Sequence, residues 1–114
     1  MNLRPGEGVR DVLVDGTRIE CRFFGGRDPR APTLVFLHEG LGSASMWRDF
    51  PGRLCARSGL AGVACSRRGY GRSDPGPGTL APRFMHDEAT VALPALLGAL
   101  GIEQPVLVGH SDGA

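Results

Sequence analysis

The fold is decided by the stretch Pro105-Val106-Leu107-Val108-Gly109-His110-Ser111-Asp112-Gly113-Ala114. Its first four residues predict a short buried strand, which leads directly into Gly-x-Ser-x-Gly. This combination predicts a nucleophile elbow, a sharp strand-to-helix turn that presents a serine hydroxyl at the edge of a sheet. Glycines two residues before and after Ser111 have a steric reason, because a Cβ at either position would collide in such a turn. The pentapeptide alone is a weak signal in a chain with 18 glycines, and its position after a strand strengthens it.

The composition indicates a turn-rich globular chain of 114 residues, which is one domain or part of one. Hydrophobic residues make up 41% of it, enough to bury a core. The net charge of +1 predicts no binding to nucleic acid or to an anionic membrane. All 13 basic residues are arginine. The absence of lysine excludes a phosphate-binding P-loop lysine and a Schiff base to a carbonyl substrate or pyridoxal phosphate, and we expect no cofactor and no metal.

The cysteines and the N-terminus favour a cytoplasmic protein. Cys21, Cys55 and Cys65 are odd in number and form no Cys-x-x-Cys pair, so we expect buried, reduced thiols. Residues 1–6 have no apolar core, so no signal peptide is predicted. The apolar runs are only a few residues long, and we expect no membrane span.

Two extended runs at the start, residues 9–14 and 17–24, flank Asp15-Gly16 and predict a β-hairpin, because both turn residues must take positive φ. The second run alternates, with Ile19, Cys21 and Phe23 on one face and Arg18, Glu20 and Arg22 on the other. Residues 33–38 form a continuous apolar run typical of a strand buried on both faces of a parallel sheet. Further strands are predicted over residues 60–65 and 104–110.

Two helices are predicted between these strands. The first runs from a cap at Ser43 or Ser45 to about Ser58, with Pro51 as an interruption and Gly59 as its end. The second spans residues 82–100 and ends at Gly101, and Pro94 should kink it at a cost of about 3 kcal/mol in isolation. Its inward-facing residues are predicted to be Ala89, Leu93, Leu96, Leu97 and Leu100.

The element order therefore predicts an α/β fold with an antiparallel hairpin followed by parallel strands. Right-handed crossovers place the last three strands in one parallel sheet with a helix on each face.

Three motifs, in this order, resemble the N-terminal half of the α/β-hydrolase family. His38-Glu39-Gly40-Leu41-Gly42-Ser43 follows the strand after which the family has its oxyanion loop. Ser66-Arg67-Arg68-Gly69-Tyr70-Gly71-Arg72-Ser73 resembles the family's Asp-x-Arg-Gly-x-Gly-x-Ser, and Gly109-His110-Ser111-Asp112-Gly113 is its elbow. The resemblance covers essentially residues 9–114. In two places the chain departs from the pattern: Glu39 replaces a glycine and Ser66 replaces the aspartate.

The resemblance implies a hydrolase in which Ser111 is the nucleophile. Backbone N–H groups of Gly40 and Asp112 would stabilise the oxyanion, and losing one such donor typically costs about 10²–10³ in rate. The implied reaction is acyl transfer to water through an acyl-enzyme, with a small ester or similar acyl compound as substrate. Glu39 and Leu41 are candidate substrate contacts.

The family order of catalytic residues is serine, then Asp or Glu, then His, so the resemblance also implies that the acid and the base follow the elbow. Only Asp112, Gly113 and Ala114 follow Ser111 in these 114 residues, so neither the expected acid nor the expected base is among them. We therefore expect residues 1–114 to be the N-terminal part of one α/β-hydrolase domain, without acid, base and lid, and to be inactive alone. None of the three histidines is expected to be the base: His38 should have a structural role, His86 should be a surface or capping residue, and His110 should line the site or pack against the sheet.

Two alternatives stay open. One is a non-catalytic or truncated α/β protein that binds a small molecule. The other is an unrelated nucleotide-binding domain, which the absent lysine and the incomplete glycine pattern after residue 40 disfavour. Arg67, Arg68 and Arg72 could form a phosphate site, but the resemblance favours a role in bracing loops.

Overall fold

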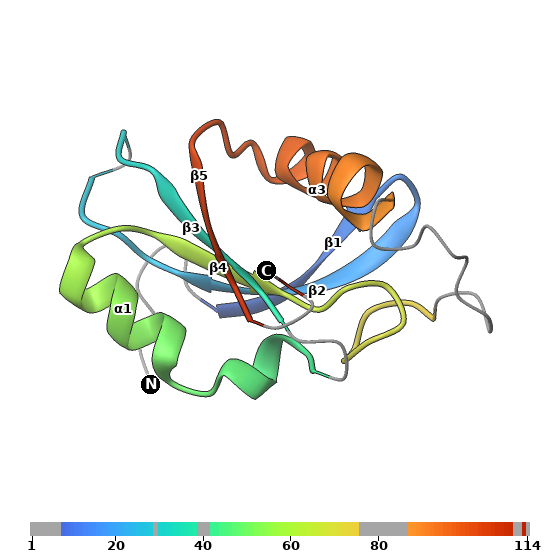
Figure 1. The fold of residues 1–114 in the computed structure, drawn as a ribbon, viewed down its shortest axis with the longest axis horizontal. Coiled ribbons are helices and arrows are strands. Elements are labelled where there is room, and N and C mark those ends of the chain that lie inside the picture. Colours follow the sequence, from blue (N-terminus) through green and yellow to red (C-terminus); the bar gives the residue numbers. More distant parts are fainter. Residues whose placement is uncertain (1–7, 29, 39–41, 76–86, 111–112, 114) are drawn as a thin grey trace.

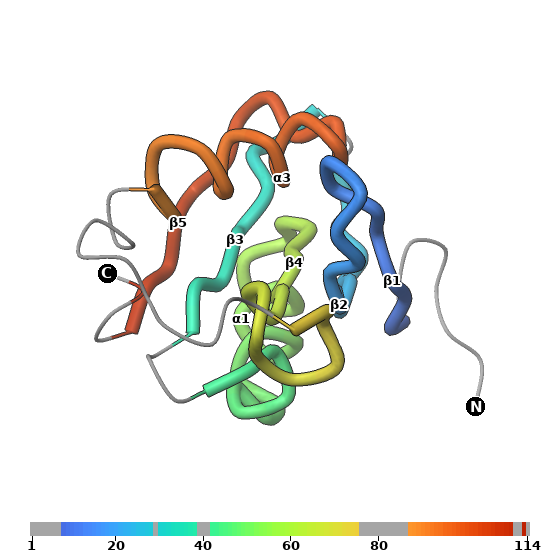
Figure 2. The backbone as a smooth tube through the Cα atoms, turned by 90° about the vertical axis from the view of Figure 1, so that its right-hand side faces the viewer, coloured from blue at the N-terminus to red at the C-terminus, as the bar shows by residue number. Residues whose placement is uncertain are grey.

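The computed structural model describes residues 8–28, 30–38, 42–75, 87–110 and 113, which contain one five-stranded sheet (Figure 1). Its strands are β1 (Gly8–Val14), β2 (Thr17–Phe24), β3 (Thr33–Leu37), β4 (Gly62–Cys65) and β5 (Pro105–Gly109). The spatial order is β1-β2-β4-β3-β5, as Figure 2 shows. β2 is antiparallel to β1 and β4, whereas β3 is parallel to β4 and β5. The predicted hairpin and the predicted parallel arrangement of the last three strands are confirmed.

The β1–β2 turn has the geometry that the Asp-Gly pair predicts. Asp15 and Gly16 have φ values of 49° and 80°, and Val14 pairs with Thr17. Both central residues therefore occupy the left-handed region, as a two-residue hairpin turn of this type requires.

The first predicted helix is wrong as a single element. It consists of a 3₁₀ turn, η1 (Ala44–Trp47), and a separate helix, α1 (Phe50–Ser58). Arg48 lies between them with φ 55°, which ends η1, and Pro51 falls in the first turn of α1, where its missing N–H costs nothing. Neither helix has the predicted side-chain cap. Gly59 ends α1 in the left-handed conformation, as predicted.

The second predicted helix is described from residue 87 onward, and its predicted start at residues 82–86 lies outside the described residues. It begins with a π-helical turn, η2 (Glu88–Ala92), in which the N–H of Leu93 donates to the carbonyl of Glu88. Pro94 follows in the first turn of α3 (Leu93–Leu100). A wider turn thus lies just before the proline, which suits a residue that cannot donate a backbone hydrogen bond.

Helices cover both faces of the sheet, as predicted, with α1 on one side and α3 on the other (Figure 1). The core on the α3 side contains Ile19, Cys21, Val35, Val63 and Cys65, against which Leu96, Leu97 and Leu100 pack. The core on the α1 side contains Leu34, Phe36, Ala44, Cys55 and Ala64. Ala89, predicted to face inward, is exposed to solvent, although it lines the cavity on this side of the sheet.

The sheet ends at β5, which pairs only with β3 in the part of the chain that is described. Val106 and Leu107 are 43% and 50% exposed. Within the described ranges, neither α1 nor α3 has the length and apolar character needed to cross a bilayer.

Candidate active site

The three motifs leave the sheet at the same edge, because β3, β4 and β5 are parallel and end side by side. In open α/β sheets, the carboxyl ends of parallel strands are where ligands bind. Five predicted site residues lie outside the described residues: Glu39, Gly40, Leu41, Ser111 and Asp112. The geometry of this edge is therefore built from the residues that flank them.

Gly113 packs directly against the end of β3. A Cβ on Gly113 would overlap the carbonyl oxygen of Leu37 and lie 2.8 Å from that of His38. The N–H of Gly113 donates to the carbonyl of His110 (3.0 Å), and the N–H of His110 donates to the carbonyl of Leu37 (3.1 Å). The predicted need for glycine two residues after Ser111 is thus explained by the neighbouring strand. The segments that flank residues 111–112 lie against the residues that precede 39–41.

His38 is buried at this edge, 2% exposed. Its Nε2 accepts a hydrogen bond of 3.0 Å from the backbone N–H of Arg67, and its ring lies 5.2 Å from that of Tyr70. An Nε2 that accepts a hydrogen bond from an amide carries no proton. Through this bond the imidazole joins the end of β3 to the loop after β4. The structure thus gives His38 the structural role expected for it.

His110 is exposed, but its ring makes an edge contact with Trp47 at 6.3 Å between centroids. Trp47 in turn contacts Phe36 at 5.4 Å and stacks on Phe50 at 5.9 Å. His110 therefore belongs to an aromatic cluster on the α1 side. His86, the third histidine, lies outside the described residues.

The arginines of the second motif brace its loop. Arg68 Nε donates to the carbonyl of Pro75 (3.1 Å), and the Arg67 guanidinium lies 5.1 Å above the ring of Tyr70. Arg72 contributes its backbone N–H, which donates to Glu20 Oε1 (3.1 Å). These contacts support loop bracing over a phosphate site.

Sequence reasoning missed Glu20. The alternation along β2 placed this residue opposite the apolar face, but it is buried, 6% exposed, under the loop after β4 and next to Ser66. The available signal was a pair of facts in the sequence: an acidic residue within the strand, and a motif whose usual aspartate is missing at position 66.

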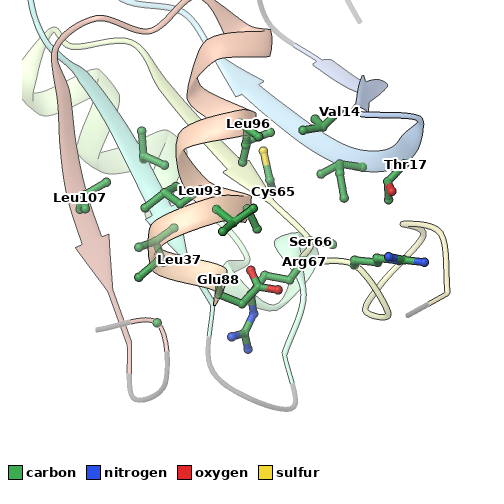
Figure 3. Close-up of a pocket in the computed structure, with 18 of the residues that line it drawn as sticks. Val14, Thr17, Leu37, Cys65, Ser66, Arg67, Glu88, Leu93, Leu96 and Leu107 are labelled. Atoms are coloured by element: carbon green, nitrogen blue, oxygen red, sulfur yellow. The ribbon is translucent and has the colours of Figure 1, made fainter. Parts of the chain in front are cut away.

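A cavity of about 740 Å³ lies between α3 and the sheet (Figure 3). Its lining includes Val35, Leu37, Cys65, Leu93, Leu96 and Leu107, and it reaches Gly109 and Gly113 at the strand ends. Glu88 and Arg67 form a polar end; burial raises the pKa of Glu88, and the charge of Arg67 partly opposes this. Cavities of this size can hold small molecules. In the described ranges, no three His, Cys, Asp or Glu side chains cluster as metal ligands would.

Comparison with known proteins agrees with the fold and with the arrangement of the strand ends. Residues 34–114 match the model of the alpha/beta hydrolase family. The chain therefore belongs to this family, and its members are hydrolases.

Individual relatives differ in their reactions. The chain is 36% identical over 90 residues to the sn-1-specific diacylglycerol lipase ABHD11 of Danio rerio, which covers 79% of this chain and 26% of the lipase. Among solved structures, epoxide hydrolase VrEH1 from Vigna radiata matches with a TM-score of 0.71 and 27% identity, over 95% of this chain and 33% of that one. The haloalkane dehalogenase DatA from Agrobacterium tumefaciens C58 matches with a TM-score of 0.75 and 25% identity, over 96% and 34%. The chain thus spans about a quarter to a third of the length of these relatives.

Proposed function

We propose that Ser111 is the nucleophile of an ester-type hydrolase, and that residues 1–114 are the N-terminal part of a single catalytic domain. The observation that carries this proposal is the packing of Gly113 against the carbonyls of Leu37 and His38. It brings the two ends of the Gly-x-Ser-x-Gly turn against the start of the loop that contains Gly40, so the nucleophile and its oxyanion donors would lie within one small region.

The proposed chemistry is acyl transfer to water. The Ser111 Oγ attacks the acyl carbonyl and gives its proton to a general base, while backbone N–H groups of Gly40 and Asp112 stabilise the oxyanion. The tetrahedral intermediate collapses, and the leaving alcohol takes a proton from the protonated base. Water then hydrolyses the acyl-enzyme by the same steps. Glu39 and Leu41 would contact the substrate at the rim.

The acid and base of this reaction are proposed to come from outside these 114 residues. In a well-studied serine protease, removing triad members costs up to about 10⁶ in kcat. The chain alone is therefore expected to be inactive, and its proposed contribution is the nucleophile and the oxyanion hole.

Similarity to a diacylglycerol lipase supports an ester as the substrate class, as does the hydroxyl nucleophile at position 111. We further propose a cytoplasmic location, supported by three cysteines that are all buried and not in disulfides. The alternative, a non-catalytic α/β protein that binds a small molecule, predicts binding without covalent labelling.

A fluorophosphonate probe tests the proposal. The 114-residue chain should show no labelling. A longer form, extended at its C-terminus to the length typical of its relatives (the completed domain), should be labelled and should hydrolyse short-chain nitrophenyl esters. Ser111→Ala should abolish both, whereas Ser45→Ala, at an exposed serine, should change neither. Labelling that persists in Ser111→Ala, or a completed domain that binds esters without turnover, would contradict the proposal.

A further inference from the structure

We propose that Glu20 is a positioning residue whose buried carboxylate fixes both loops at the candidate active site. The motif after β4 has Ser66 where the α/β-hydrolase motif has an aspartate. A carboxylate is nevertheless present beside Ser66, and it comes from a different strand, β2. The network around this carboxylate is seen directly in the described residues. Its catalytic consequence rests on the function proposed above.

Strand pairing places Glu20 next to Ser66. The N–H of Ser66 donates to the backbone carbonyl of Glu20 (2.9 Å), one step beyond the pair Cys21–Cys65 in the antiparallel β2–β4 ladder. Residues directly opposite each other in such a ladder point their side chains to the same face. Both side chains are buried, and Ser66 has no exposed surface.

The hydrogen bonds of Ser66 have only one possible direction. The backbone N–H of Ala44 donates to Ser66 Oγ (2.9 Å), so the single hydroxyl proton must go elsewhere. It is donated to Glu20 Oε1 at 2.8 Å. The same oxygen accepts the backbone N–H of Arg72 at 3.1 Å. One carboxylate oxygen thus holds the loop after β4 directly and the start of η1 through Ser66.

A second hydroxyl completes the arrangement. Ser73 Oγ accepts the backbone N–H of Glu20 (2.8 Å) and donates to the carbonyl of Ser66 (2.6 Å). Gly71, with φ 53°, leaves the necessary room: a Cβ there would lie 2.5 Å from Ser66 Oγ and 2.6 Å from Glu20 Oε1. Glycine at position 71 of the motif therefore leaves space for the Glu20 carboxylate, which comes from β2.

The network anchors one end of the loop that contains Gly40. His38, at the other end, is held by the N–H of Arg67, and Ala44 is held through Ser66. An oxyanion donor works only if it is fixed before the reaction, and a displacement of 1 Å can cost about 10² in rate. Charge-assisted hydrogen bonds are about twice as strong as neutral ones, which suits a carboxylate to this task.

Amide hydrogen exchange tests the network independently of any activity. The variants are Glu20→Ala, Glu20→Gln and Ser66→Ala, with Glu103→Gln as a control that makes the same chemical change at an exposed glutamate. The amide of Val63, in the buried centre of β4, reports global unfolding. In Glu20→Ala, exchange at Ala44 and Arg72 should rise at least about 10-fold more than at Val63, because hydrogen bonds to a charged group are lost.

The other variants test how the bonds are connected. Ser66→Ala should accelerate exchange at Ala44 more than at Arg72, since Glu20 still accepts from Arg72. Glu20→Gln keeps a carbonyl acceptor, so both rates should lie between those of the wild type and Glu20→Ala, and this variant decides the question if Glu20→Ala does not fold. Glu103→Gln should match the wild type. Equal acceleration at Ala44, Arg72 and Val63, or none, would overturn the proposal.

The catalytic consequence is measured on the completed domain. Glu20→Gln should lower kcat for ester hydrolysis with little change in KM, because the loop that carries the oxyanion donor is displaced while substrate contacts remain. An unchanged kcat would overturn the positioning role even if exchange is accelerated. If the wild type and the variant both lack turnover, the proposed function fails, and a positioning role for Glu20 fails with it. The hydrogen-exchange result still decides whether Glu20 holds the amides of Ala44 and Arg72.

Discussion

The imidazole of His38 accepts the backbone N–H of Arg67 at 3.0 Å, and this bond joins the end of β3 to the start of the loop after β4. Replacing the buried His38 by Ala leaves the half-buried amide of Arg67 without its acceptor. We expect the free energy of unfolding to fall by about 1–3 kcal/mol, measured by urea denaturation. His110→Ala, at an exposed histidine, is the control and should cost less. Equal losses in the two variants would argue against the bond.

Gly113 and Gly98 form a matched pair for the packing at the strand ends. Gly113→Ala places a methyl group onto the backbone carbonyl of Leu37, which cannot move without disturbing β3. We expect a loss of about 1–3 kcal/mol in the free energy of unfolding. Gly98→Ala adds the same group to α3 where nothing lies within 4 Å, and should stabilise by about 0.5–1 kcal/mol. A neutral Gly113→Ala, measured by the same denaturation, would contradict the close contact.

Cys65 should be unreactive in the folded chain. A hydrogen bond with Cys21 and burial raise the pKa of the Cys65 thiol far above its usual range. Iodoacetamide at neutral pH should therefore leave it unmodified until the chain is denatured, as mass spectrometry can establish.

The raised pKa of the Cys65 thiol also makes the free energy of unfolding depend on pH. Above about pH 9 the unfolded thiol loses its proton while the folded one keeps it, so the unfolded state binds fewer protons and stability falls as pH rises. Below that pH the stabilising contribution is fully present. Cys65→Ala should flatten the decline between pH 8.5 and about 10 in urea titrations; an unchanged slope would be evidence against this assignment.

The edge strand β5 should make the 114-residue chain self-associate. Val106 is 43% exposed on a strand with one described neighbour, and bare apolar strand edges aggregate. Val106→Lys should reduce the associated fraction in size-exclusion chromatography with light scattering. Met46→Lys is the control, because Met46 is more accessible (57%) but lies in the 3₁₀ turn η1 and not on a strand. A wild-type chain that is monomeric and melts cooperatively would contradict the prediction.

Features with local causes could be predicted from the sequence. The Asp15-Gly16 turn, the ends of α1 and α3 at Gly59 and Gly101, and the parallel order of the last strands all follow from backbone preference, apolar runs and the handedness of crossovers. The break at Arg48 could not be predicted, because this residue has a positive φ without being a glycine, so no residue type in the sequence marks the position.

For the candidate site, the sequence by itself determined which three segments meet, because motifs that follow parallel strands must leave the sheet at one edge. It also determined that Gly113 has to be small, although the atoms that demand this belong to Leu37 and His38 at the end of β3. Only the tertiary structure decided that Glu20 is buried. Alternation assigns a side chain to a face of a strand, but whether that face meets water or a loop depends on segments dozens of residues away, here the amides of Ala44 and Arg72 and the hydroxyl of Ser66.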